Sequence, residues 1–315
     1  MSEILIPEKH HAVKGLLNAV IKSCREISDI LRNGPIQDEP TVQTNASGDS
    51  QHKIDILANN VLLKNIERTK SCKFIISEEN EFPVFMDKNG SYCVAFDPLD
   101  GSSNIDCNIP TGTIFSIWNA KDVSETDCLL STQDIICCGY CIYSAATELI
   151  LVFNDSRPPA RYILSQDSIN LISFVSIPND SKKICSVNNG NSKHWTDTTS
   201  WIVKTFVNNQ YSNRYVGSLI ADVHRTLLYG GIYLYPSITK PKLRLLYEVG
   251  PIAKIIKAAG GDVLSETGID ILDMRPGSIH EKIDLICGSE RDVNFYRNLH
   301  KFSELMFKQN FNILN

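Results

Sequence analysis

Hydrophobic residues recur at helical spacing in two segments near the start of the chain. The first spans residues 10–32 and stops at Asn33-Gly34-Pro35, and the second spans about 53–69. This spacing predicts two amphipathic helices, because residues three and four apart lie on one face of a helix. Residues 35–52 contain two prolines, a glycine and many polar residues, so we expect a mobile loop between the helices.

Apolar runs of strand length follow the second helix. They lie at residues 73–76, 92–96, 113–118, 135–143 and 149–153, with a further partner near Tyr162. Their hairpin-like spacing predicts a mixed, substantially antiparallel sheet. A polar stretch at 178–183 precedes a second alternation of strands and helices, which includes a helix at 251–259 shortly after Glu248. We therefore expect an α/β protein with an N-terminal domain at 1–176 and a C-terminal domain at 177–315.

The composition narrows the class of protein. The 315 residues are 43% hydrophobic and 21% charged, with a net charge of -5, which is typical of a globular chain and leaves no basic footprint for nucleic acid. No apolar run approaches the roughly 18 residues of a membrane span, and the first residues do not resemble a signal peptide. We therefore expect a cytoplasmic protein without nucleic-acid or membrane partners. In such a protein the ten cysteines should remain thiols.

Two aspartates close one of the apolar runs. Residues 96–106 read F-D-P-L-D-G-S-S-N-I-D, which places Asp97 and Asp100 at the carboxyl end of a buried strand. A buried carboxylate is costly unless a cation compensates its charge. Gly101, Ser102 and Ser103 follow at once, and their N–H and hydroxyl groups can bind an anion. The stretch suits a divalent cation beside a phosphate; the structural alternative is an Asx-turn in which both aspartates only cap backbone groups.

Further carboxylates share this placement at the ends of apolar elements. They are Asp49, Asp55, Glu78, Glu79 and Glu248. Converging carboxylates repel one another unless cations hold them, and an all-oxygen ligand set suits Mg²⁺ or Mn²⁺. Such a cluster beside an anion site indicates metal-assisted hydrolysis of a phosphate ester, and the motifs of P-loop enzymes and kinases are missing. For Asp55, capping of its helix is an equal alternative.

Five short segments carry a family resemblance. They are I-S-E-E at 76–79, the run at 96–106, R-Y-V-G-S at 214–218, A-D-V-H-R-T at 221–226 and K-L-R-L-L-Y-E at 242–248. In this order they resemble the class I fructose-1,6-bisphosphatases of the Mg²⁺-dependent, lithium-sensitive sugar phosphatases, over about residues 16–289. The resemblance implies a layered αβαβα fold of α/β (α+β) type with mixed sheets. It also implies Mg²⁺-dependent hydrolysis of the 1-phosphate of fructose 1,6-bisphosphate to fructose 6-phosphate, a step of gluconeogenesis.

The resemblance also implies roles for the matching residues. Two or three Mg²⁺ ions per subunit, or Mn²⁺, would be bound by Asp49, Glu78, Asp97, the Leu99 carbonyl, Asp100 and Glu248. Asp55 and Glu79 would orient and deprotonate the attacking water. The departing 1-phosphate would be held by Gly101, Ser102 and Ser103. The retained 6-phosphate would be held by Asn188, Tyr215, Tyr235, Lys242 and, from a neighbouring subunit of a homotetramer, Arg214.

Several residues have plain structural alternatives. Tyr215 and Tyr235 could be half-buried strand aromatics, Lys242 a solvated charge and Arg214 part of a surface ion pair. We expect Asp106 and Asp222 to brace the site, and His224 and Arg225 to be structural.

Other functions stay open at this point. Sedoheptulose-1,7-bisphosphatases and dual-specificity enzymes differ by few side chains, and Asn191 stands where the family often has a tyrosine. An inositol-phosphate phosphatase would not need the 6-phosphate residues, and a non-catalytic sugar-phosphate sensor or scaffold would normally have lost a ligand or a base. Of the residues that the resemblance implies for AMP inhibition only Tyr92 is present, so we expect that inhibition to be weak or absent.

Overall fold

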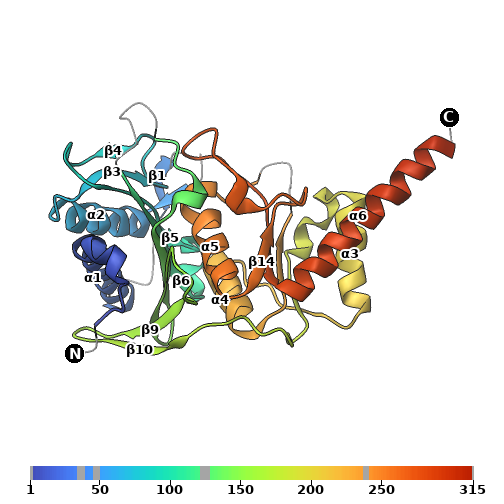
Figure 1. The fold of residues 1–315 in the computed structure, drawn as a ribbon, viewed down its shortest axis with the longest axis horizontal. Helices are drawn as coiled ribbons and strands as arrows, with labels where there is room; N and C mark the ends of the chain where they lie inside the picture. The colour runs from blue at the N-terminus through green and yellow to red at the C-terminus, as the bar shows by residue number, and fades with distance from the viewer. Residues whose placement is uncertain (1–2, 34–39, 45–49, 121–127, 237–240, 314–315) are drawn as a thin grey trace.

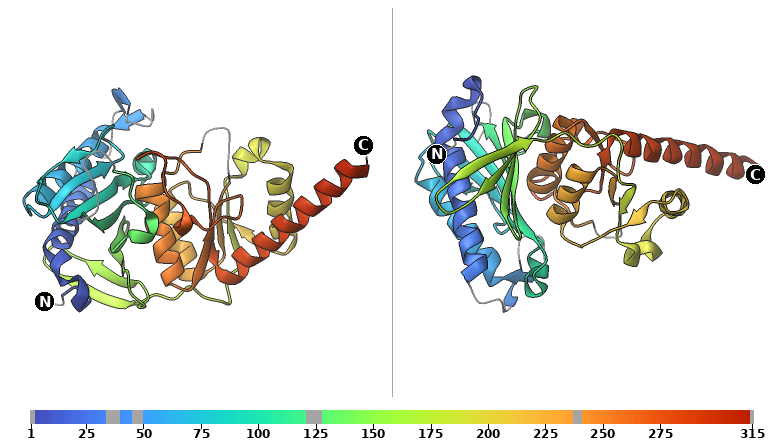
Figure 2. Two further views of the ribbon diagram at one scale, coloured as in Figure 1. Left: turned by 45° about the horizontal axis from the view of Figure 1, so that its top comes forward. Right: turned by 90° about the horizontal axis from the view of Figure 1, so that it is seen from below.

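Five layers make up the protein (Figure 1). The computed structural model describes residues 3–33, 40–44, 50–120, 128–236 and 241–313. The layers follow one another in this order: helices α1 and α2, an eight-stranded sheet, helices α4 and α5, a five-stranded sheet, and helices α3 and α6. This is the αβαβα arrangement with two mixed sheets that the family resemblance implies, so the expected fold class is confirmed. Two further views keep α4 and α5 between the sheets (Figure 2).

The first layer confirms both early helices. A 3₁₀-helix at Glu8–Val13 leads into α1 (Lys14–Asn33), and α2 spans Lys53–Glu67. The expectation of a loop at 35–52 is partly wrong, because β1 (Pro40–Thr44) and β2 (Ser50–His52) pair as an antiparallel hairpin. Both strands are short and mostly polar, so the alternation that identifies a half-buried strand is missing from their sequence.

The first sheet has the strand order β10-β9-β8-β7-β6-β5-β3-β4. Its strands are β3 (Cys72–Ser77), β4 (Val84–Phe85), β5 (Tyr92–Asp100), β6 (Thr111–Asn119), β7 (Cys137–Tyr143), β8 (Thr147–Phe153), β9 (Ala160–Leu164) and β10 (Ile169–Phe174). Only β3 and β5 pair in parallel; the other neighbours are antiparallel. Helices cover both faces of its central strands, which explains the nearly unbroken apolar runs.

The second half of the chain builds the other sheet and its helices. The sheet order is β12-β11-β13-β15-β14. Its elements are β11 (Ile184–Ser186), α3 (Asp197–Asn208), β12 (Ser212–Asn213), α4 (Leu219–Tyr229), β13 (Ile232–Tyr235), α5 (Gly250–Ala258), β14 (Gly261–Leu264), β15 (Leu285–Ser289) and α6 (Glu290–Ile313). Short 3₁₀-helices lie at Ser102–Cys107 (η2), Thr132–Asp134 (η3), Asn189–His194 (η4) and Ile271–Asp273 (η6).

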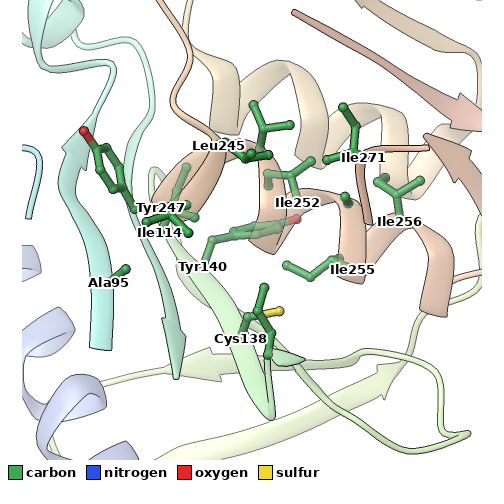
Figure 3. Close-up of a cluster of buried hydrophobic side chains, with 14 of the residues drawn as sticks. Ala95, Ile114, Cys138, Tyr140, Leu245, Tyr247, Ile252, Ile255, Ile256 and Ile271 are labelled. Atoms are coloured by element: carbon green, nitrogen blue, oxygen red, sulfur yellow. The ribbon is translucent and has the colours of Figure 1, made fainter. Parts of the chain in front are cut away.

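One expected strand is a helical turn. Residues 245–247 read as the end of a buried strand before Glu248, but Leu245–Val249 forms a π-helix, η5, that continues into α5. Residues 245–249 are all buried. A run of apolar residues this short does not show whether its spacing is that of a helix or of a strand. Figure 3 shows the packing: Tyr140 and Cys138 of β7 lie opposite Ile252 and Ile255 of α5. This core fixes η5 beside the first sheet.

The cysteines and the helices bear on two further expectations. The cysteines are free thiols, and Cys107 alone among them is exposed, so the expectation of unpaired thiols is confirmed. Among the helices described, none is long and apolar enough to cross a membrane.

Candidate active site

Three buried carboxylates converge between the first sheet and η5. Carboxylate oxygens of Asp97, Asp100 and Glu248 all lie within 4.8 Å of one another. Asp97 and Asp100 would point to opposite faces of a regular strand, because side chains alternate with a period of two. The register of β5 against β6 shifts between them, however, with Asp97 opposite Ile114 and Asp100 opposite Gly112. This one-residue bulge between Asp97 and Asp100, in a stretch where Pro98 has no N–H for the ladder, allows both carboxylates to face one site.

Glu78 and Arg244 complete the charged part of this cluster. Glu78 follows β3, and its Oε1 lies 2.8 Å from an Nη of Arg244. Arg244 is only 5% exposed. Arg244 also donates its backbone N–H to Glu248 over 2.7 Å, and its guanidinium lies 3.8 Å from the same carboxylate. Four carboxylates thus share one arginine nearby, which leaves the group rich in negative charge.

Burial raises the pKa of the clustered acids. The pKa of Asp97 rises well above its usual value through burial, with Glu78 and Asp100 adding repulsion, although Leu99 donates its N–H to the carboxylate over 2.9 Å. Burial raises the pKa of Asp100 to about 7, even though it accepts the Ile220 N–H at the start of α4 over 2.8 Å. The pKa of Glu248 is also raised by burial, against the opposing effect of Arg244. These carboxylates can ionise together only with further positive charge.

The expected water-activating pair lies beside this cluster. Asp55 is in the first turn of α2 and is 4% exposed; it accepts the His52 N–H over 3.0 Å and a hydrogen bond from Ser102. Burial raises its pKa to about 6. Glu79 follows Glu78, and its N–H donates to Ser77 Oγ, which in turn donates to Asn59 one turn after Asp55. A helix cap and a functional acid are therefore compatible at Asp55.

The glycine-serine segment forms a tight turn next to the carboxylates. Gly101 has a left-handed φ of 79°, and η2 begins at Ser102. A Cβ on Gly101 would lie 2.7 Å from Ser218 Oγ, the cap of α4, so any other residue would have to displace Ser218 as well as adopt the left-handed φ. Ser102 is half-buried and Ser103 is exposed. The turn carries N–H groups and hydroxyls one to three residues after Asp100, and such a turn can bind an anion.

A second polar group lies where the chain reaches the other sheet. Asn188 hydrogen bonds Tyr215, and the backbone of Lys242 hydrogen bonds Tyr235 at the end of β13. Burial raises the pKa of both tyrosines, that of Tyr235 to about 12. The negative charge of Asp100 adds to the rise at Tyr215, and that of Glu248 adds to the rise at Tyr235. The structure therefore brings these four expected residues together and places them beside the carboxylate cluster.

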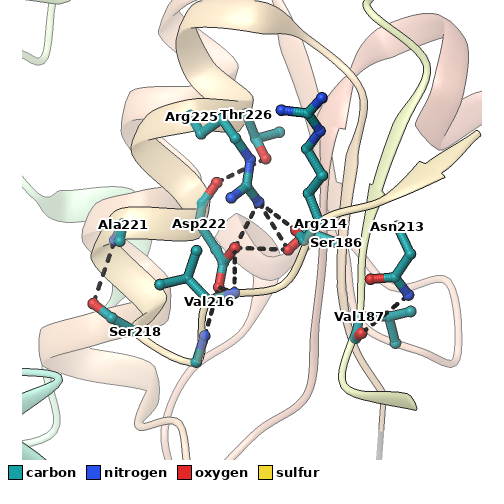
Figure 4. A network of polar contacts seen from close by, with 11 residues as sticks. Ser186, Val187, Asn213, Arg214, Val216, Ser218, Ala221, Asp222, Arg225 and Thr226 are labelled. Carbon is teal, nitrogen blue, oxygen red and sulfur yellow. Dashed lines mark hydrogen bonds and ion pairs between the residues drawn. The ribbon is translucent and has the colours of Figure 1, made fainter. Parts of the chain in front are cut away.

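The segment that carries Tyr215 is held by a buried aspartate (Figure 4). Asp222, in the first turn of α4, accepts the N–H groups of Val216 and Gly217 over 3.0 and 3.1 Å. Arg225 pairs with Asp222 over 2.5 Å and donates to the carbonyl of Arg214 over 2.6 Å. The Arg214 side chain is exposed. Asp222 and Arg225 thus have the bracing positions that the sequence suggests.

One predicted metal ligand lies outside the described residues, and one charged residue of the site was not predicted. Asp49 lies outside the described residues, so its position is not given. Arg244 was not singled out from the sequence, although a charged residue inside the apolar run K-L-R-L-L-Y-E was a usable signal, since a buried arginine requires acidic partners.

The comparisons with known proteins agree on one family. The family models for the fructose-1-6-bisphosphatase N-terminal and C-terminal domains match residues 3–162 and 177–301. The cytosolic fructose-1,6-bisphosphatase of Oryza sativa subsp. indica is 36% identical over 93% of this chain and 91% of its own. Fructose-1,6-bisphosphatase isozyme 2 of Bos taurus is 37% identical over 92% of each chain. The crystal structure of Leishmania major fructose-1,6-bisphosphatase in holo form superimposes with a TM-score of 0.86 at 31% identity, covering 94% of this chain and 96% of the other. The chain belongs to the fructose-1,6-bisphosphatase family.

Proposed function

We propose that this chain hydrolyses the 1-phosphate of fructose 1,6-bisphosphate and releases fructose 6-phosphate and phosphate, as a step of gluconeogenesis. One observation carries the proposal: three buried carboxylates meet within 4.8 Å directly beside the Gly101 turn. A second group of polar residues, around Tyr215 and Tyr235, lies next to them. A substrate with two phosphates would match this pair of neighbouring sites.

The carboxylates fit a hard divalent cation. All donors are oxygen atoms. The pKa of Asp97, Asp100 and Glu248 is raised first by burial and then by repulsion from neighbouring acids, and a bound cation would offset both effects. The family is metal-dependent, and we propose Mg²⁺, two or three ions per subunit, with Mn²⁺ as a substitute. Glu78, Asp97, the Leu99 carbonyl, Asp100, Glu248 and Asp49 would hold them. Bound there, the metal would lower the pKa of a water molecule and neutralise charge on the phosphate.

The protein residues would divide the remaining work. Asp55, with a pKa of about 6, is ionised near neutral pH yet basic enough to accept a proton from the attacking water together with Glu79. The N–H groups and hydroxyls of Gly101, Ser102 and Ser103 would bind the oxygens of the 1-phosphate. Asn188, Tyr215, Tyr235 and Lys242 would hold the 6-phosphate and fix the sugar's orientation.

The test combines a substrate panel with one substitution. Phosphate release is measured from fructose 1,6-bisphosphate, sedoheptulose 1,7-bisphosphate and inositol 1-phosphate, with Mg²⁺ and with chelator. We expect the fructose substrate to react fastest, and Asp97→Asn to lose activity by about a hundredfold or more, since transition-state charge loses its counterion. Asp180→Asn, at an exposed position, is the matched control. Full activity in chelator, or in Asp97→Asn, would contradict the metal mechanism.

We also propose a homotetramer in which Arg214 reaches the 6-phosphate of a neighbouring subunit. The exposure of Arg214, at the end of the segment braced by Asp222, supports this. Mixed oligomers of Arg214→Ala and Asp97→Asn subunits should recover activity that each variant lacks, whereas residues acting within one chain would give no recovery.

Location and domain division are proposed on the same basis. Relatives from Oryza sativa and Spinacia oleracea are named cytosolic, and we propose a cytoplasmic protein. We propose domains at 1–176 and 177–315, since the strands of the two large sheets end at Phe174 and begin at Ile184.

A further inference from the structure

A cavity of about 520 Å³ lies on α1, away from the carboxylate cluster. One wall is the C-terminal half of α1, and the other is formed by Thr147 at the start of β8 and by residues 164–167 at the end of β9. The β9–β10 hairpin reaches across α1 in the view from below (Figure 2), and Arg25 donates to the carbonyl of Ser168 in its turn over 3.0 Å. The volume is that of an ordinary small-molecule site.

The α1 wall is a polar stripe on one helix face. Arg25, Ser28, Asp29 and Arg32 all line the cavity. Their spacing of three, four and seven residues places them together, because such positions are neighbours on a helix surface. The rest of α1 packs hydrophobic side chains against the first sheet, so this stripe is a distinct feature of the helix.

Within the described part of the chain, both arginines on this stripe contact only neutral oxygens. Arg25 donates to the Ser168 carbonyl, and its Nε is buried without a hydrogen-bond partner. Arg32 donates to Thr147 Oγ1 over 3.1 Å. Among the residues described, no carboxylate lies within ion-pair distance of either guanidinium, in contrast to Arg161 and Arg244, which both contact glutamates. A buried unsatisfied N–H on Arg25 and two guanidinium groups without a carboxylate partner among the described residues favour an anionic ligand, with phosphate as a good geometric match.

The floor and outer wall add groups for hydroxyls. Ser28 Oγ and Thr147 Oγ1 are 2.6 Å apart and buried, so they form a hydroxyl pair at the bottom. Asp29, Ser165 and Asp167 also line the cavity. Two carboxylates would repel a pure polyanion, but they accept hydrogen bonds from ligand hydroxyls.

We propose that this cavity binds a small phosphorylated polyol, with its phosphate on Arg25 and Arg32 and its hydroxyl groups on the Ser28–Thr147 pair and the two aspartates. None of these residues belongs to the carboxylate cluster or to the proposed 6-phosphate group. It is therefore a second ligand site, independent of the proposed hydrolysis.

The test measures binding of glycerol 3-phosphate by calorimetry to the full chain in chelator. Arg25→Gln and Arg32→Gln should each weaken binding about tenfold or more, as expected for loss of a charge-assisted contact. Lys22→Gln is the matched control, because it removes the same charge from an exposed position on α1. Glycerol, which lacks the phosphate, should not bind detectably.

Three outcomes would overturn the proposal. They are equal affinity in the arginine variants and the control, equal binding of glycerol, and no binding of glycerol 3-phosphate up to about 10 mM. Circular dichroism and phosphate release without added ligand show whether each variant is folded. Because binding is read directly, an inactive protein would still test this site, and a failed binding test would leave the proposed hydrolysis standing.

Discussion

The guanidinium of Arg244 lies 2.8 Å from Glu78 Oε1 and 3.8 Å from the nearest carboxylate oxygen of Glu248. Burial opposes the charge of Arg244, but Glu248 and Glu78 outweigh this effect and raise its pKa. The arginine is therefore a permanent cation within a group of acids that also includes Asp97 and Asp100. Its presence lets part of the acidic cluster stay ionised before any metal binds.

Replacing Arg244 by methionine should destabilise the metal-free protein. Methionine keeps much of the volume, but Glu78 and Glu248 lose their counterion, and breaking a buried ion pair typically costs about 3–5 kcal/mol. We expect the free energy of unfolding in urea with chelator to fall by roughly this amount. Added Mg²⁺ should restore part of it, because the ion supplies positive charge to the same acids.

The matched control for this variant is Arg68→Met. Arg68 is exposed at the end of α2 and should change the free energy of unfolding by less than about 0.5 kcal/mol. Equal losses for the two variants, or a loss at Arg244 that Mg²⁺ does not change, would show that the arginine does not balance the metal ligands.

The contribution of Asp55 and Asp100 to the stability of the metal-free protein should fall as pH rises from about 4 to about 7. The folded-state pKa values of Asp55 and Asp100, about 6 and about 7, lie above the ordinary value of 3.8. The folded state therefore binds more protons than the unfolded state in this window, and its advantage is lost as pH passes the folded pKa. Mg²⁺ should remove this trend near neutral pH, since its ligands must be deprotonated and binding releases their protons.

Urea titrations at several pH values, with and without chelator, measure this dependence. Asp100→Asn should flatten the curve, because the amide does not ionise, whereas Asp180→Asn at an exposed position should not. An equal pH dependence of stability in the unaltered protein and in Asp100→Asn would contradict the direction assigned to the pKa of Asp100.

The local sequence predicts most of the site because its acids stand at the ends of apolar runs. Asp97, Asp100 and Glu78 could be placed from the strands that precede them, since a parallel pair such as β3 and β5 ends at the same edge of a sheet. Gly101 was identifiable from its turn-forming neighbours. The layered fold and the residues expected at the 6-phosphate were predicted from the family resemblance. The spacing of apolar residues within one segment does not show how two sheets pack against each other.

Other features depend on tertiary contacts. The bulge between Asp97 and Asp100 brings both carboxylates to one side, but the sequence shows only a proline in this stretch. The π-helical turn before α5 reads as a strand, because Leu245 and Leu246 are buried on all sides. The pairing of Arg244 with Glu78 joins positions 166 residues apart, and no local pattern predicts such a contact.

Asp222→Asn should weaken substrate binding more than it slows the chemical step. Asp222 accepts the N–H groups of Val216 and Gly217, and an asparagine would present an NH₂ group to one of these donors. Losing a buried charged hydrogen bond costs about 1.5–3 kcal/mol, so we expect KM for the bisphosphate to rise tenfold or more. Steady-state kinetics separate KM from kcat, with Asp197→Asn as an exposed control. A change confined to kcat would show that Asp222 does not act by positioning Tyr215.

Gly101→Ala and Gly268→Ala separate backbone strain from steric collision. Both glycines have a left-handed φ, 79° and 84°, so each alanine should cost about 1–2 kcal/mol of stability through strain. At Gly268 nothing lies within 4 Å of the added Cβ, whereas at Gly101 it meets Ser218 Oγ at 2.7 Å. The Ser218 hydroxyl caps α4 and donates to Asp100. Turning it away from the added Cβ would break both contacts; otherwise the turn at Gly101 or the start of α4 has to shift. We therefore expect Gly101→Ala to lose phosphate release about a hundredfold in an assay with Mg²⁺, because small misplacements of catalytic groups have effects of that size. Gly268→Ala should keep full activity despite a similar strain; equal activity in both variants would mean that the turn at Gly101 tolerates displacement and does not position the phosphate.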